Sequence, residues 1–117
     1  MDTHEVLDLA ADIIEEQGWT QGPDGWPDNP DDTGPVCIEG ALTRAMGLDY
    51  FADCAKVVES PAMRVLSAHL GRALIHPFEW NDQEGRTAEE VIAALREAAD
   101  LERHRAAELA AQELVSA

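Results

Sequence analysis

Apolar side chains near the start of the chain recur every three or four positions, a spacing typical of a helix with one buried face. Asp2 and Glu5 form a capping-box pattern at its start, and Gly18 is placed to end it. The pattern therefore predicts a first helix whose buried stripe contains Val6, Leu9, Ala10, Ile13 and Ile14.

Residues 18–35 interrupt this periodicity with four glycines and four prolines, which exclude a long helix or strand. Two tryptophans, Trp19 and Trp26, lie in the same segment, and a disordered linker rarely keeps side chains of this size. We expect an ordered loop with at least one indole packed on the helices, and a short extended stretch at residues 19–21.

Helical periodicity and helix-starting residues return after this loop. They predict three further helices, over residues 35–47, 50–59 and 61–73. Residues 74–86 lack such a pattern and are expected to form another loop, anchored by the aromatic side chains of Phe78 and Trp80.

The last helix begins at a capping box formed by Thr87 and Glu90 and is expected to continue toward Val115. Beyond Asp100 the apolar pattern weakens, although alanine and glutamate still favour a helix. The sequence thus predicts a mainly α fold, with about five helices, a long ordered Trp-, Pro- and Gly-rich loop and an extended C-terminal helix. Its predicted parts are a core over residues 1–99, which includes the 18–35 loop, and a helical extension over residues 100–117.

The net charge of −16 at pH 7 is concentrated early in the chain, because residues 1–43 hold eleven acids and no Lys or Arg. Such a surface disfavours direct binding to nucleic acids and anionic membranes, and it favours a protein partner with a basic surface. No apolar run approaches the roughly 20 residues that span a bilayer, and the N-terminus lacks the basic and apolar regions of a secretory signal. We therefore expect a soluble protein of the bacterial cytoplasm.

Several short motifs occur in order along the chain, namely GWTQG at residues 18–22, VCIEGAL at 36–42, AHL at 68–70, and WND followed by GRTAEEV within 80–91. This ordered set resembles an uncharacterised family of small, acidic, helical proteins from actinobacteria and their phages, a domain of unknown function, over about residues 3–99. The acid-rich loop around Trp26 and the tail after Asp100 depart from the family pattern. The resemblance implies a shared fold and an actinobacterial or phage source, and it supplies no activity or catalytic residue.

The turn Trp80-Asn81-Asp82 holds the cluster of side chains that most resembles a functional site. One hypothesis places Asn81 and Asp82 at the cleft of a small-ligand binder or an enzyme, together with His76 and Glu79. The other makes Trp80 an anchor of the loop, while Asn81 or Asp82 satisfies backbone amides. The second is favoured, because Asn-Asp shortly before a glycine is ordinary turn chemistry.

Two cysteines and four histidines are candidates for a metal site or a nucleophile, namely Cys37, Cys54, His4, His69, His76 and His104. Their spacing matches no zinc motif, and the aspartates of the 18–35 loop lack the order of a calcium-binding EF-hand. We therefore expect no cofactor, no metal and no catalytic residue, with both cysteines reduced and partly buried.

The leading functional hypothesis is a non-catalytic module that binds a host or cellular protein through an acidic, tryptophan-containing surface or through the C-terminal helix. An aromatic anchor in a polar rim is typical of binding hot spots, so the expected contact residues are Trp26, Asp28, Asp31 and Asp32. One alternative is a DNA mimic that occupies a nucleic-acid-binding protein. Another is a ligand binder or enzyme at the 76–82 region, and a homodimer through the C-terminal helix is a further alternative.

Overall fold

The computed structural model of the chain describes residues 1–22, 33–71 and 76–116. These residues form six helices, and their only β-type pairing is an isolated parallel bridge between Trp19 and Val36. The helices are α1 (Thr3–Gln17), α2 (Ile38–Ala45), α3 (Tyr50–Val58), α4 (Pro61–His69), α5 (Pro77–Asn81) and α6 (Ala88–Ser116). The mainly α fold is thereby confirmed. None of the described helices is long and apolar enough to cross a membrane.

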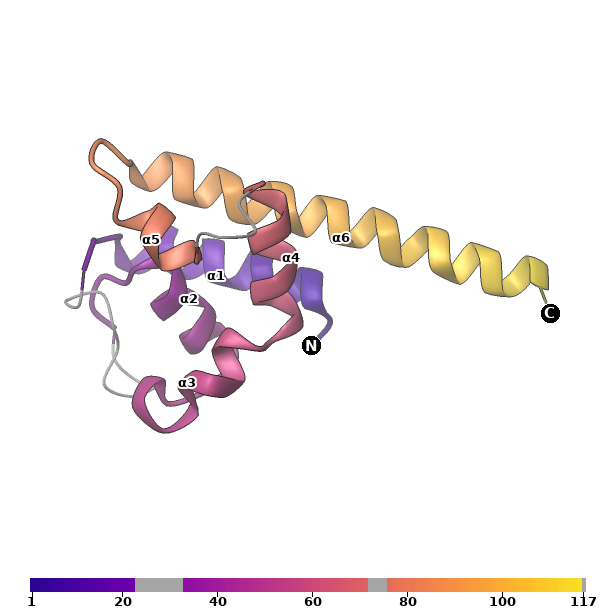
Figure 1. The fold of residues 1–117 in the computed structure, drawn as a ribbon, viewed down its shortest axis with the longest axis horizontal. Coiled ribbons are helices and arrows are strands. Elements are labelled where there is room, and N and C mark those ends of the chain that lie inside the picture. The colour runs from indigo at the N-terminus through magenta and orange to yellow at the C-terminus, as the bar shows by residue number, and fades with distance from the viewer. Residues whose placement is uncertain (23–32, 72–75, 117) are drawn as a thin grey trace.

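The core forms where α1 lies along the first half of α6, with α2 and α4 packed against the pair (Figure 1). Its largest fully buried side chains include Leu7, Ile38, Leu42, Leu66 and Leu95. Helix α1 contacts α2, α4 and α6, so its buried face is wider than the predicted stripe and includes Leu7, which the pattern missed. Leu9, which was assigned to that stripe, is only half-buried.

Capping side chains hold the starts of α1, α4 and α6, and the caps of α1 and α6 are those that the sequence predicted. Asp2 and Glu5 form the capping box of α1, and Ser60 accepts a hydrogen bond from the Met63 amide at the start of α4. Thr87 and Glu90 cap α6 reciprocally.

Helix α2 differs from the prediction, because it begins at Ile38 and not near Pro35. Val36 is held in the bridge with Trp19, and Cys37 is the N-cap residue of the helix. The predicted short extended stretch after α1 is one side of this bridge, since the Thr20 amide donates to the Val36 carbonyl.

Residues 77–81 form the short helix α5, where the sequence pattern predicted only a loop over residues 74–86. The Nδ1 atom of His76 accepts a hydrogen bond from the Phe78 amide at 3.3 Å, which caps the helix. Pro77 occupies the first turn, where its missing N–H costs no helical hydrogen bond. A helix of five residues is too short to show an apolar period in the sequence.

Helix α6 continues without a break for 29 residues, and its two halves lie in different surroundings. Its first half is buried against the core through Val91, Leu95, Ala98 and Ala99. From Leu101 to Val115 every side chain is exposed except the half-buried Glu102. This second half projects beyond the other helices (Figure 1) and stretches the molecule to 49 × 28 × 26 Å.

Candidate functional site

Asn81 is fully buried at the end of α5, and both ends of its side-chain amide are hydrogen-bonded. Its Oδ1 accepts from the indole Nε1 of Trp19 at 2.6 Å and from the backbone amide of Ile38 at 3.0 Å. Its Nδ2 donates to the Thr20 carbonyl at 3.4 Å and to Asp82 Oδ1 at 3.0 Å. One side chain therefore joins the segment after α1, the start of α2 and the end of α5.

Further hydrogen bonds hold the segment after α1 against the same turn. The Nε2 atom of Gln21 donates to the carbonyls of Asn81 and Gln83 at 3.0 and 2.9 Å. The Gly22 amide donates to Asp82 Oδ1 at 2.9 Å. We call the turn at residues 80–82, with residues 19–22 and 38, the Asn81 joint.

Trp80, the first residue of this turn, is buried and is covered by Arg86. The guanidinium carbon of Arg86 lies 3.9 Å from the centre of the indole, and its Nε donates to the Trp80 carbonyl at 3.1 Å. Apart from the hydrogen bond between these two side chains, Asn81 and Asp82 use their side chains to contact segments distant in the sequence and not the backbone of their own turn. The motifs at residues 18–22, 36–42 and 80–91 therefore meet in one place, and their geometry is that of a structural joint.

The alternative of a ligand site requires His76 and Glu79 to converge with Asn81 and Asp82. His76 is half-buried, and this burial lowers its pKa. It lines an open groove, but Glu79, Asn81 and Asp82 do not line that groove. Glu79 and Asp82 are exposed, whereas the amide of Asn81 is enclosed by its hydrogen bonds. This groove does not bring the four side chains together.

The contact residues expected in the acidic loop lie outside the described residues; they are Trp26, Asp28, Asp31 and Asp32. The chain has three tryptophans, and the indoles of the other two, Trp19 and Trp80, are engaged at or beside the Asn81 joint. A tryptophan-containing contact surface would therefore depend on Trp26.

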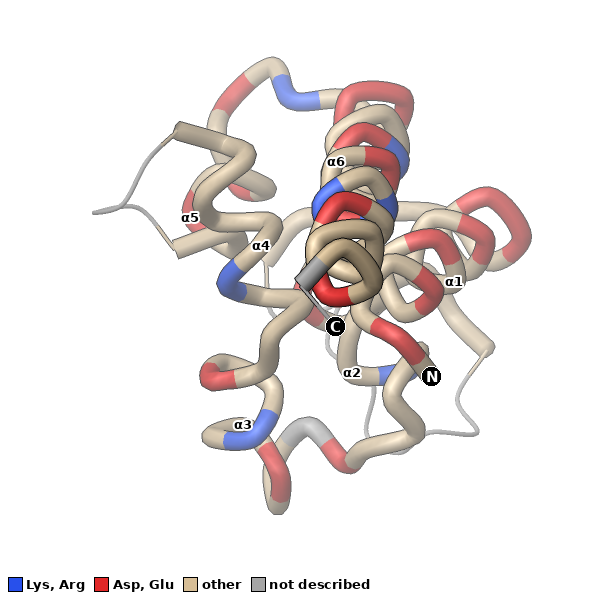
Figure 2. The backbone as a smooth tube through the Cα atoms, turned by 90° about the vertical axis from the view of Figure 1, so that its right-hand side faces the viewer, with Lys and Arg blue, Asp and Glu red and all other residues tan. Residues whose placement is uncertain are grey.

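The acidic side of α1 faces two arginines from α6. Arg96 lies 2.6 Å from Asp12 and 3.2 Å from both Asp8 and Glu15, and Arg103 lies 2.7 Å from Asp8. The hydrogen bond to Asp12 and those to the other carboxylates raise the pKa of Arg96. Figure 2 shows basic positions interleaved with acidic ones along α6, beside the acidic positions of α1. This face is partly neutralised within the chain, whereas a phosphate-like surface needs free carboxylates.

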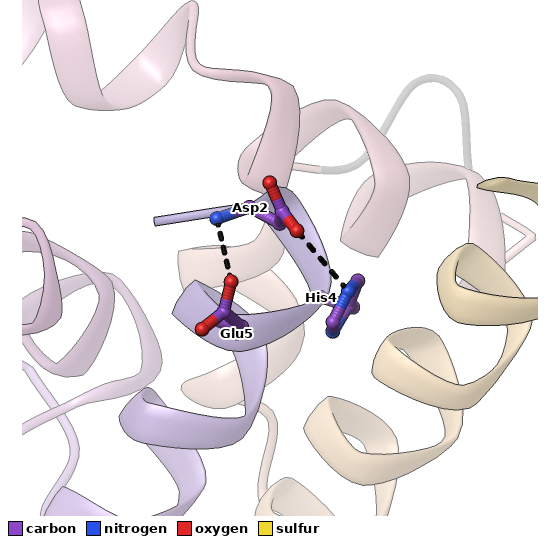
Figure 3. Close-up of side chains that lie close together, drawn as sticks. All are labelled: Asp2, His4 and Glu5. Carbon is purple, nitrogen blue, oxygen red and sulfur yellow. Dashed lines mark hydrogen bonds and ion pairs between the residues drawn. The ribbon is translucent and has the colours of Figure 1, made fainter.

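Three side chains at the N-terminus, Asp2, His4 and Glu5, bring potential metal ligands within 4.8 Å of one another (Figure 3). The Asp2 amide donates to Glu5 Oε1 at 3.0 Å, and His4 Nε2 lies 3.6 Å from Asp2 Oδ2. Both carboxylates are exposed and already serve the capping box of α1. The cluster is therefore explained as a helix terminus.

Cys37, the N-cap of α2, and Glu39, in its first turn, are both buried. Burial raises the pKa of Cys37 to about 11, so its thiol stays protonated and unreactive at neutral pH. Burial likewise raises the pKa of Glu39. Cys54 differs from Cys37 because it is exposed on α3, although both were expected to be partly buried. No sequence signal singles out Glu39, since a glutamate on a helix is ordinarily exposed.

An open groove of about 530 Å³ lies between α4 and the middle of α6; its lining consists of Pro61, Arg64, Val65, Ala68, His69, Leu101, Glu102 and Arg105. His69 Nε2 lies 3.0 Å from Glu97, and Arg105 lies 3.1 Å from Glu102. The guanidinium of Arg64, in contrast, makes no hydrogen bond or ion pair with any described residue. We call this feature the α4–α6 groove, and sequence reasoning gave no signal for it.

The projecting half of α6 begins beside this groove and carries aliphatic side chains into solvent. Leu101 is 58% exposed, Leu109 46%, Leu114 81% and Val115 87%. Residues 106–115 also contain two exposed glutamates and no Lys or Arg. The groove and this half of α6 form the candidate interaction surface among the described residues.

The chain belongs to DUF6197, a family of unknown function, whose model matches residues 1–101. No curated protein and no solved structure shows significant similarity to the chain. The matched range includes the Asn81 joint and the packed half of α6, and it ends where α6 leaves the core.

Proposed function

We propose that this member of a family of unknown function is a non-catalytic protein-interaction module, with the projecting half of α6 as its contact element. The observation that carries the proposal is the exposure of aliphatic side chains along residues 101–115. This segment extends about 21 Å, at 1.5 Å per residue, without burying an apolar face. Helices in proteins owe most of their stability to such burial, which a partner would supply here.

The charge of the chain bears on the kind of partner. The net charge is −16, and the outer part of the contact element, residues 106–115, holds two glutamates and no Lys or Arg, so a basic protein surface would be attracted over long range. We propose a host or cellular protein of the bacterial cytoplasm as the target, in keeping with the actinobacterial or phage source that the motifs indicate. The loop with Trp26, Asp28, Asp31 and Asp32 is proposed as a second contact surface.

A crosslinked pull-down from an actinobacterial lysate tests this proposal. The decisive variant replaces Leu109, Leu114 and Val115 by alanine, which removes the aliphatic contacts and keeps helix propensity high. Phe51→Ala, which removes an exposed apolar side chain on α3, is the matched control, and Trp26→Ala tests the loop.

We expect one captured protein that the control retains and the triple variant loses. If Trp26→Ala alone abolishes capture, the contact lies in the loop and not on α6. Capture that survives both changes, or no specific capture at all, would contradict the proposal. A captured DNA-binding protein that duplex DNA displaces would instead support mimicry.

A further inference from the structure

Arg64 gives the α4–α6 groove a positive charge, whereas the chain as a whole is strongly negative. Its side chain is exposed, and its guanidinium has no hydrogen-bond or ion-pair partner among the residues that the structure describes. Arg105 lines the same groove, and Val65 and Leu101 supply aliphatic walls. Guanidinium groups bind carboxylates strongly, so the groove suits a segment that combines carboxylates with aliphatic side chains.

The end of α6 is such a segment. Glu108 and Glu113 stand there beside Leu109, Leu114 and Val115, and all five side chains are exposed. The segment is unable to reach the groove of its own chain, because α6 is continuous and carries it away from α4. At 1.5 Å per residue, residue 113 lies about 12 Å beyond residue 105 along the helix axis.

Beyond the proposed function, we propose that in the absence of a cellular partner the α4–α6 groove receives the acidic end of α6 from a second copy of the chain. The projecting segments of two copies, each about 21 Å long, can lie antiparallel. The C-terminal end of α6 of one copy then lies beside the start of the projecting segment of the other, where the groove lies. In a dimer with two-fold symmetry this contact occurs twice. In each contact Arg64 pairs with Glu108 or Glu113 of the second copy, and aliphatic side chains cover Val65 and Leu101.

Charge favours a second copy over a basic protein as the occupant of this groove. A basic surface would be repelled at the groove by the exposed guanidinium of Arg64, whereas Glu108 and Glu113, which would attract it, lie beyond the groove of their own chain. The end of α6 matches both features, because it offers carboxylates and aliphatic groups without a Lys or Arg. Like-charge pairs at an interface are costly, so exchanging these charges gives a sensitive test.

The experiment is a charge exchange followed by sedimentation velocity of the full chain at an ionic strength of about 0.15 M, which screens the repulsion between two acidic copies. One variant carries Arg64→Glu and the other carries Glu108→Lys with Glu113→Lys. We expect the unaltered chain to dimerise and each variant alone to dimerise more weakly by at least about tenfold. An equimolar mixture of the two variants should dimerise again, because both groove contacts then pair opposite charges.

Matched controls carry the same charge changes away from the groove. They are Lys56→Glu on α3, and Glu16→Lys on α1 combined with Glu84→Lys, all at exposed positions. Circular dichroism checks that every variant keeps its helix content. Monomeric unaltered protein, variants that dimerise as well as the controls, or a mixture that stays monomeric would each overturn the inference. A monomeric chain that still captures a cellular protein through α6 would refute the dimer and leave the proposed function standing.

Discussion

The two halves of α6 share one unbroken helix and differ in almost everything else. Residues 88–100 place Val91, Leu95, Ala98 and Ala99 against the core, whereas residues 101–115 leave Leu109, Leu114 and Val115 in solvent. The first half lies within the range matched by the family model, and nearly all of the second lies beyond it.

Helix formation and burial are therefore separate properties of this sequence. Alanine and glutamate favour a helix in both halves, but a stripe of apolar side chains facing the core exists only in the first. The first half is therefore part of the fold. The second half leaves its aliphatic side chains exposed, and for this reason we propose it as the contact element.

Substitution of a leucine in each half should separate these roles most strongly. Leu95→Ala removes a fully buried side chain and should lower the free energy of unfolding by roughly 2–5 kcal/mol. Leu109→Ala should change it by no more than about 0.5 kcal/mol, because the side chain is half exposed on the projecting segment. Urea unfolding monitored by circular dichroism at low protein concentration measures both. Equal losses would show that the second half belongs to the core.

The Asn81 joint should give the next largest effect. Asn81→Ala leaves the Trp19 indole N–H and the Ile38 amide without their acceptor, and should lower the free energy of unfolding by roughly 2–3 kcal/mol. Glu79→Ala, an exposed change in the same short helix, is the control and should have little effect. A stable Asn81→Ala variant would mean that the joint does not hold these segments together.

The buried Glu39 should make the free energy of unfolding depend on pH. Burial raises the pKa of Glu39 in the folded chain above its unfolded value, so its ionisation disfavours folding at neutral pH. Glu39→Gln should therefore stabilise the protein at pH 7, and the gain should shrink as pH falls through the carboxyl range. Gln112→Ala, which changes an uncharged and exposed side chain of α6, is the control and should show no such dependence on pH. Unfolding curves from pH 7 to pH 4 measure the two differences.

Features that depend on local sequence were predictable. The capping boxes at Asp2 and Thr87 act over three residues, and the apolar period of α1 and α6 repeats within one helix. The start of α2 was not predictable from local rules, because Val36 is drawn into a bridge with Trp19 across the loop. Helix α5 depends on a cap and a proline within five residues, which is too short for any period.

The candidate sites depend on contacts that no local pattern contains. The Asn81 side chain meets Trp19 from 62 positions earlier, so the motifs suggested importance without showing that they form one joint. The α4–α6 groove depends on how two separate helices pack. The sequence does not show that Arg64 lacks a partner among the described residues, because that depends on the positions of the surrounding side chains.

Hydrogen–deuterium exchange along α6, measured at a low and a high protein concentration, tests the division of this helix most directly. We expect residues 88–100 to exchange slowly at both concentrations, because they are part of the core. Residues 101–115 should exchange rapidly in the dilute sample and gain protection in the concentrated one, as the projecting segment finds a second copy. Slow exchange of residues 101–115 in the dilute sample, or no gain in protection with concentration, would contradict the account.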